Sequence, residues 1–303
     1  MESKIFYLNK IPGFAGRCND ILYSSPLRVT AVHRLIVFFG GDVQDLKSCM
    51  EKHNDSKRYL MWSLENTLSI LSKRFPQSHI MIVRPSRMEI KSYAVFSCYD
   101  NFVPGDEYGV PSFKPNNNAL LHLSKLLRSV LTQVSQQDIL GVNLTLMAFS
   151  KGCVVLNQFL HEFHHIQNQE NLDENLKDLT KRIKDIWWLD GGHAGTKDTW
   201  INDKRILESF AKLGTLVLDM SCGNVKHWIL KNFYVVGIKV YVYVTPYQVN
   251  DKRRPWIKNQ ENLFCKTLQE LHVPVQRTLH FKEEKPSLTT HFNVLTVIKD
   301  IST

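Results

Sequence analysis

The stretch LTLMAFSKGCVVLNQFL, residues 144–160, decides the fold. It begins as a continuous apolar run, typical of a strand covered on both faces, and continues after Ser150 and Gly152 with helical spacing. A serine at such a turn, with glycine two residues later, approximates the G-x-S-x-G nucleophile elbow. Ala148 stands at the first glycine position and is small enough for a crowded turn. The alternative is a serine that only caps the following helix.

Similar apolar runs recur along the chain, separated by stretches with helical spacing. The runs are RLIVFF (34–39), HIMIVRP (79–85), NLTLMAF (143–149), DIWWLD (185–190), KVYVYV (239–244) and VPVQRTLHF (273–281). The helical stretches are SLENTLSILSKRF (63–75), ALLHLSKLLRSVLTQV (119–134), CVVLNQFLHEFHHI (153–166) and NQENLFCKTLQELH (259–272). This alternation predicts an α/β fold with a mainly parallel central sheet and helices on both faces.

The chain of 303 residues contains no linker rich in proline, glycine or serine. We therefore expect one domain, residues 32–303, preceded by an extended arm, residues 1–31, with a loop excursion at 103–118. No apolar stretch approaches the ~18 residues of a membrane span, since the longest β-rich run carries Lys239. The N-terminus has neither a secretory signal nor a transit-peptide pattern.

The spacing of the cysteines, histidines and glycines argues against a metal site, a disulfide framework and a phosphate-binding loop. The six cysteines form no CxxC pair, and His161, His164 and His165 lack HExxH spacing, so no metal or disulfide is expected. Neither phosphate-binding glycine motif is present, and we expect no cofactor. The net charge of +9 favours acidic ligands, and a solvated basic surface explains it better than nucleic-acid binding.

Polar residues follow several predicted strands, where a parallel sheet binds its ligands. They include Gly40-Gly41-Asp42, Ser150-Lys151-Gly152, Asp190-Gly191-Gly192-His193 and Thr245-Pro246 followed by Asp251. A serine nucleophile needs a base and an orienting acid, which in hydrolases with this elbow follow it in the order acid, then histidine.

The candidate catalytic residues are Ser150, Asp251 and His291, in that order along the chain. His291 lies after the last predicted strand, whereas the alternative, His280, lies within the pattern of that strand. Asp190 is the alternative acid, because it ends the strand that follows the serine, with His193 nearby. We prefer Asp251 and His291.

The oxyanion formed by attack on a carbonyl needs two backbone N–H groups. Lys151 would supply one, and the turn FFGGD would supply the other from Gly41 or Asp42. A simple turn explains the two glycines equally well. Lys252, Arg253 and Arg254 could attract an anionic substrate to the rim of the site.

Six segments together, VFFGGDVQ, WSLEN, FSCYDNFV, FSKGCVVLNQ, WLDGGH and VTPYQV, resemble the mitochondrial α/β-hydrolase-like family named after an open reading frame of chromosome two. The resemblance runs from about Val32 to the C-terminus. It implies an α/β-hydrolase fold, a mitochondrial location, in the matrix, and a link to respiratory function. The family's serine corresponds to Ser150, its DGGH acid and histidine to Asp190 and His193, and its later acid and histidine to Asp251 and His291.

This chain departs from the family at Ala148, in an added segment around 215–236, and in having no clear presequence. If the missing presequence decides the location, the protein would be cytoplasmic. The expected function is that of a serine hydrolase that cleaves an ester, thioester or amide of a small acyl substrate. The alternative is a non-catalytic α/β-hydrolase scaffold that binds or assembles mitochondrial proteins.

Overall fold

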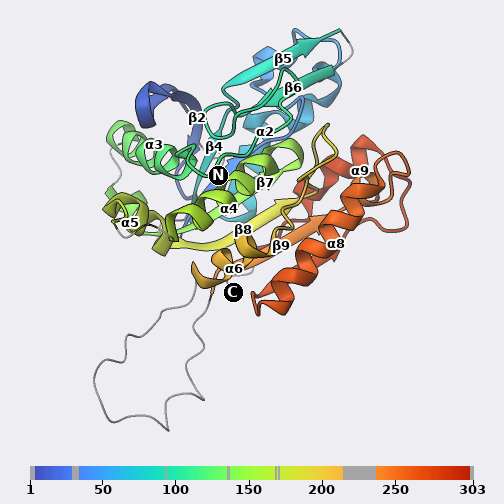
Figure 1. Cartoon of the computed structure of the whole chain (residues 1–303). Helices are drawn as coiled ribbons and strands as arrows, with labels where there is room; N and C mark the ends of the chain where they lie inside the picture. The colour runs from blue at the N-terminus through green and yellow to red at the C-terminus, as the bar shows by residue number, and fades with distance from the viewer. Residues whose placement is uncertain are drawn as a thin grey trace.

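The computed structural model describes residues 4–28, 34–92, 94–134, 137–167, 169, 171–213 and 237–300. The added segment expected around 215–236 therefore lies outside the described residues. Two sheets are present in the described part (Figure 1). The larger contains β1 (Phe6–Pro12), β2 (Cys18–Ser24), β4 (Ser78–Val83), β3 (Arg34–Phe39), β7 (Asn143–Phe149), β8 (Ile183–Leu189), β9 (Lys239–Val244) and β10 (Val275–Leu279), in that spatial order.

The helices follow the pattern that the sequence predicts, with additions. They are α1 (Lys47–Met50), α2 (Leu64–Arg74), α3 (Ala119–Val134), α4 (Cys153–Gln167), α5 (Glu174–Arg182), α6 (Lys204–Leu213), α7 (Pro246–Val249), α8 (Pro255–Glu270) and α9 (Leu288–Asn293). Short 3₁₀ turns occupy η1 (Phe14–Gly16), η2 (Ser56–Trp62), η3 (Gln137–Leu140), η4 (Ser150–Gly152) and η5 (Val294–Thr296). None of the described helices is both long and apolar enough to cross a membrane.

Six strands of the larger sheet, β4, β3, β7, β8, β9 and β10, pair in parallel with their neighbours. Their side chains build two cores. Leu35, Val37 and Phe39 of β3 face a core shared with α3, α4, α6 and α8, whereas Ile36 and Phe38 face a core shared with α2 and the segment after α9. Successive side chains of a strand point to opposite faces, and both faces of β3 are buried. The continuous apolar run of β3 is thus explained, and the predicted α/β fold class is confirmed.

The N-terminal segment differs from the expected extended arm. Its described part forms β1 and β2, an antiparallel pair that joins the sheet through β2 and β4. Ile11, Ile21 and Tyr23 are buried in the core. Residues 4–28 are therefore part of the same domain, and not an arm beside it.

A second hairpin, which the sequence did not indicate, stands beside the main sheet. β5 (Arg87–Lys91) and β6 (Ala94–Cys98) pair antiparallel and form the smaller sheet (Figure 1). The predicted loop excursion at 103–118 follows β6 and lies outside the named helices and strands. The two segments bring additional residues to the carboxyl end of the main sheet.

The parallel register brings the ends of four strands together. Phe39 pairs with Ala148, Phe149 with Leu189, and Leu189 with Tyr243. The segments that follow β3, β7, β8 and β9 therefore leave the sheet at one edge, as the sequence predicts.

The turn after β7 depends on Gly152. A Cβ atom at this position would lie 2.3 Å from the carbonyl oxygen of Phe39 and 2.6 Å from that of Gly40. Both obstacles are backbone atoms, which cannot rotate away. Only glycine lets α4 begin this close to the end of β3.

We therefore expect Gly152→Ala to lower the free energy of unfolding by about 1–3 kcal/mol through overpacking. Urea denaturation of the purified protein measures the change. Gly237→Ala is the matched control, because the nearest atom to a Cβ there is 4.0 Å away. An equal effect of the two substitutions would contradict the close-approach explanation.

Candidate functional site

Ser150 lies in a strained turn between β7 and α4. Its φ is 52°, in the left-handed region that residues with a side chain rarely adopt, and its side chain is largely buried. Left-handed backbone at such a residue is typical of functional turns. No hydrogen bond joins the Ser150 hydroxyl to another of the described residues. The predicted strand, turn and helix are all present, with the serine oxygen at the sheet edge.

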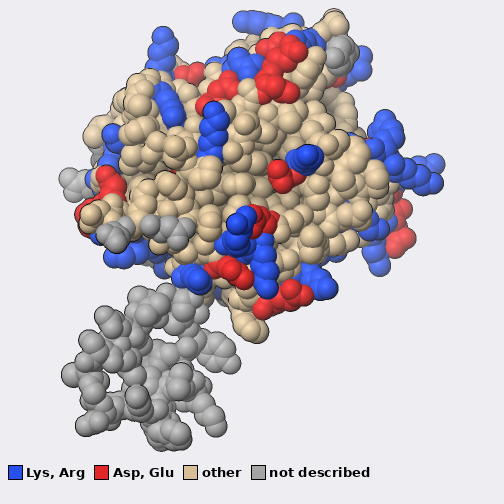
Figure 2. Space-filling view, in the orientation of Figure 1, with Lys and Arg blue, Asp and Glu red and all other residues tan. Residues whose placement is uncertain are grey.

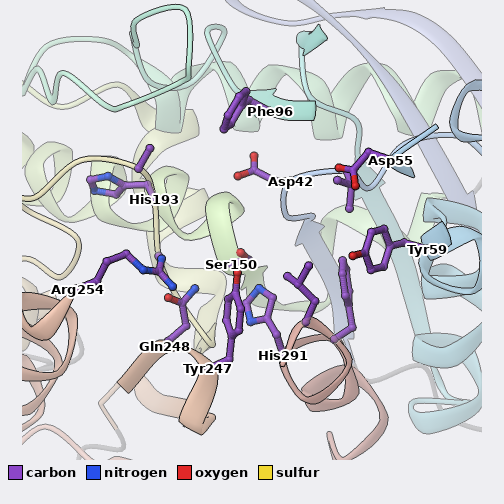
Figure 3. A pocket seen from close by; sticks show the side chains of 15 residues that line it. Asp42, Asp55, Tyr59, Phe96, Ser150, His193, Tyr247, Gln248, Arg254 and His291 are labelled. Carbon is purple, nitrogen blue, oxygen red and sulfur yellow. The ribbon is translucent and has the colours of Figure 1, made fainter. Parts of the chain in front are cut away.

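His291, on α9, belongs to the same site. Its imidazole packs 4.5 Å from the ring of Phe149 and 4.7 Å from the ring of Tyr247, measured between centroids. Phe149 immediately precedes the serine, and both Ser150 and His291 line one pocket (Figure 3). The preference for His291 over His280 agrees with this geometry, because His280 follows β10 and packs against Tyr243.

Asp190, and not Asp251, lies against His291. Asp190 follows β8, is fully buried, and its Oδ2 is 2.6 Å from Nδ1 of His291. The same carboxylate accepts hydrogen bonds from the backbone N–H of Thr245 at 2.7 Å and from its hydroxyl at 2.5 Å. With Nδ1 donating to the carboxylate, Nε2 of His291 is left as a hydrogen-bond acceptor.

Asp251 has a different role, so the preferred pairing of Asp251 with His291 is wrong. Its carboxylate accepts hydrogen bonds from Arg253, through the backbone and side chain, and from Nε of Arg254 at 3.0 Å. These bonds lower the pKa of Asp251. Asp251 lies beyond α7, which carries the chain away from the strand end. It fixes Arg254, which lines the pocket.

The predicted oxyanion donors differ in whether their N–H groups already have a hydrogen-bond partner. The N–H of Gly41 donates to Oε1 of Gln44 at 2.8 Å and is already satisfied. A Cβ on Gly41 would lie 2.8 Å from Cβ of Ser150, so this turn does pass directly beside the serine. The N–H groups of Asp42 and Lys151 are the remaining candidates. The side chain of Asp42 accepts from the N–H and hydroxyl of Ser97 on β6.

Lys151 belongs to the elbow itself, and His193 lines the pocket beside it. The Lys151 side chain is fully buried, and its Nζ donates to the carbonyl of Tyr108 at 2.6 Å, which ties the loop 103–118 to the elbow. Burial, with the charge of Lys151 as a second cause, lowers the pKa of His193 to about 4. His193 is therefore neutral near pH 7. Its Nδ1 accepts from the N–H of Gly195.

The pocket has a volume of about 240 Å³ (Figure 3). Its lining comprises Asp42, Val43, Asp55, Tyr59, Phe96, Ser150, Gly192, His193, Ala194, Tyr247, Gln248, Arg254, Leu288, His291 and Phe292. In Figure 3, Ser150 and His291 lie at its base, with Asp42, Asp55 and Phe96 on one side and Arg254 and Gln248 on the other.

The histidines of α4 make packing and hydrogen-bond contacts with neighbouring segments. On α4, His161 stacks on Phe113 at 5.0 Å between ring centroids, and Nδ1 of His164 is hydrogen-bonded to Ser209. The part of the chain that the structure describes holds no group of three or more side chains arranged to bind a metal ion.

The segment after β9 supports the site through contacts that were not predicted from the sequence. Thr245 holds Asp190, and Nε2 of Gln248 donates to the carbonyl of Asp190 at 3.2 Å. A Cβ on Gly192 would lie 2.4 Å from Nε2 of Gln248, so the turn after β8 and α7 are closely fitted. The only signal was a Thr-Pro pair at a strand end, which is also a common helix start.

Several known protein structures resemble this chain at low similarity. An acylaminoacyl peptidase of Pyrococcus horikoshii matches at a TM-score of 0.47 and 12% identity, over 98% of this chain and 40% of that one. Carboxyl esterase 2 of Tuber melanosporum matches at a TM-score of 0.47 and 12% identity, over 98% of this chain and 81% of that one. The fold assignment itself rests on the strand order and on the turn at Ser150.

Sequence relatives identify the family. A family model described as C2orf69 matches residues 7–141, 130–221 and 219–274. The chain is 32% identical to the mitochondrial protein C2orf69 homolog of Danio rerio over 315 residues, which cover 95% of this chain and 84% of that protein. It is 31% identical to the Mus musculus homolog over 309 residues, which cover 86% and 76% respectively. The relatives' names bear out the mitochondrial location expected from the resemblance, and the chain belongs to the C2orf69 family.

Proposed function

We propose that this protein is a serine hydrolase that cleaves an ester, thioester or amide through an acyl-enzyme on Ser150. One observation carries the proposal. Ser150, in a left-handed turn at a strand end, shares a pocket with His291, and the ring of His291 is hydrogen-bonded to the buried Asp190. These are the parts that a nucleophilic serine needs.

In the first half of the reaction, Nε2 of His291 takes the proton of the Ser150 hydroxyl as the oxygen attacks the substrate carbonyl. The carbonyl π electrons move onto its oxygen, which accepts hydrogen bonds from the N–H groups of Lys151 and Asp42. The tetrahedral centre then collapses. The leaving group departs with the proton from His291, and the acyl group stays on Ser150.

In the second half, His291 takes a proton from a water molecule, whose oxygen attacks the acyl carbonyl. Collapse of this second tetrahedral centre releases the acid and returns the proton to Ser150 through His291. Asp190 keeps its hydrogen bond to Nδ1 throughout, holds the ring of His291 in one orientation and stabilises the imidazolium. Asp190 thus takes the role that the sequence had favoured for Asp251.

We expect a fluorophosphonate probe to label the purified protein at Ser150. Ser150→Ala removes the nucleophile and should abolish labelling, and His291→Ala should slow it by about 10³-fold or more through loss of the base. Intact-mass spectrometry and the rate of labelling measure both effects. Glu174→Gln, at an exposed residue on α5, is the control for a change that leaves the site alone.

If the folded wild-type protein gives no labelling, the serine is not activated. The protein would then be a binding scaffold with the same fold. Circular dichroism and thermal melting of each variant separate loss of reactivity from loss of structure.

The two candidate acids can be told apart by matched substitutions. Asp190→Asn should slow labelling about 10³- to 10⁴-fold, because the amide cannot stabilise the imidazolium or hold the same tautomer. Asp251→Asn should slow it less than about tenfold, since its carboxylate contacts arginines and not His291. A larger loss in Asp251→Asn than in Asp190→Asn would reverse the assignment.

Thr245→Val tests the support of Asp190. The substitution removes the hydroxyl donor and leaves the backbone donor, so one of the three hydrogen bonds to the carboxylate is lost. We expect the free energy of unfolding to fall by about 1–3 kcal/mol, measured by urea denaturation. An unchanged stability would show that the hydroxyl does not help to hold the buried charge.

A further inference from the structure

Two acidic side chains face the serine from one side of the pocket. Asp42 follows β3, and Asp55 precedes η2, so they come from different segments of the chain. Figure 3 shows both carboxylates on the side of the pocket away from Arg254. Ser150 lines the same pocket, is 8% exposed, and its hydroxyl has no partner among the described residues, so a buried polar group is available to a ligand there.

The cations near the pocket make contacts other than ion pairs with these carboxylates. Arg254 is bound through Nε to Asp251, and His193 is neutral near pH 7. The Lys151 ammonium donates to the neutral carbonyl of Tyr108 and lies 5.9 Å from the ring centroid of Phe96. Within the described ranges, no lysine, arginine or histidine forms an ion pair with Asp42 or Asp55. Asp42 and Asp55 thus add two formal negative charges to the upper part of the pocket in Figure 3, and the Lys151 ammonium near Phe96 adds one positive charge beside it.

Both carboxylates have capacity for a ligand. The two bonds from Ser97 go to Oδ1 of Asp42, and Oδ2 has no hydrogen-bond partner among the described residues. Asp55 makes no side-chain hydrogen bond to the described residues, and its charge contributes to the raised pKa of Tyr59, for which burial is the larger cause. The charge of Asp55 therefore acts on Tyr59, which lines the pocket.

Aromatic rings surround the same space. Tyr59 and Phe96 line the pocket beside the two carboxylates, and Tyr247 lines it beside His291 (Figure 3). The faces of aromatic rings attract cations, and they do so most strongly in partly desolvated sites. Two of these rings already face cations of the chain: Nζ of Lys151 lies 5.9 Å from the centroid of Phe96, and Cζ of Arg254 lies 5.5 Å from that of Tyr247. The ring of Tyr59, together with the two carboxylates, favours a positively charged group over an anion.

We propose that the substrate of this site carries a positively charged group, an ammonium or a guanidinium, which binds between Asp42 and Asp55. This inference rests on the hydrolase function proposed above and specifies the charge of its substrate. It runs against the overall charge of +9, which favours acidic ligands. On the face shown in Figure 2, basic side chains are scattered over the surface with acidic ones among them.

A bound cation also serves the chemistry. The backbone N–H of Asp42 is one of the proposed oxyanion donors, so its own carboxylate brings a negative charge to the neighbourhood of the developing oxyanion. A positive group on the substrate offsets that charge. Neutral and anionic substrates lack this compensation, and the site discriminates against them.

The test uses two acetate esters of equal shape, acetylcholine and 3,3-dimethylbutyl acetate, in which a quaternary nitrogen replaces a quaternary carbon. Binding of each to the Ser150→Ala protein is measured by isothermal titration calorimetry, so that hydrolysis does not interfere. We expect acetylcholine to bind about tenfold more tightly, and the difference to shrink at high salt.

The isosteric substitutions Asp42→Asn and Asp55→Asn, each made in the Ser150→Ala protein, should reduce this preference severalfold. Glu174→Gln in the same background should leave it unchanged. Because Asp55 makes no structural hydrogen bond, Asp55→Asn remains informative if Asp42→Asn disturbs the turn.

Equal binding of the two esters, tighter binding of the neutral ester, or binding of neither would overturn the proposal. Fluorophosphonate labelling of the wild-type protein reports separately on the hydrolase function. Labelling without a preference for the cation would remove this inference alone. A preference for the cation without labelling would leave a cation-binding pocket and remove the hydrolase.

Discussion

The buried carboxylate of Asp190 is the centre on which the site depends. An ionised carboxylate without partners is very costly to bury, so the fold must supply donors. It does so from two segments distant in sequence, Thr245 after β9 and His291 on α9. The same bonds that satisfy the charge also fix the position of the histidine. The hydrogen bonds that stabilise the buried charge therefore also set the geometry of the pocket.

The sheet register brings two of the residues that form these hydrogen bonds, Asp190 and Thr245, to one edge of the sheet. Because β7, β8 and β9 are adjacent and parallel, the residues that follow them leave at one edge. The left-handed φ of Asp190, 48°, and of Ser150, 52°, show that the chain turns sharply at the ends of two neighbouring strands. Such turns let side chains stand above the edge of the sheet without a long loop between strand and site.

Much of this arrangement could be predicted from sequence, because it depends on short patterns. Continuous apolar runs identified β3, β7, β8 and β9, and the turn at Ser150 followed from its place between a strand and a helix. The acid could not be chosen in the same way. Asp190 and Asp251 both follow strands, and the difference arises from α7, a four-residue helix that directs Asp251 towards Arg253 and Arg254. The strand β1 was missed because its residues are mostly exposed and carry no clear alternation.

The bond between Asp190 and His291 joins residues 101 positions apart in the chain. Closing so long a loop costs conformational entropy before the contact can repay it, and contacts of high sequence separation slow the folding of a chain. The helix that carries His291 has only six residues and is held in place by packing, with Phe292 and Leu295 beside α2 and β3 in one core. In kinetic terms, a partly folded molecule could complete β3, β7 and their covering helices while its serine still lacked a base. Reactivity would then be confined to chains that have finished folding.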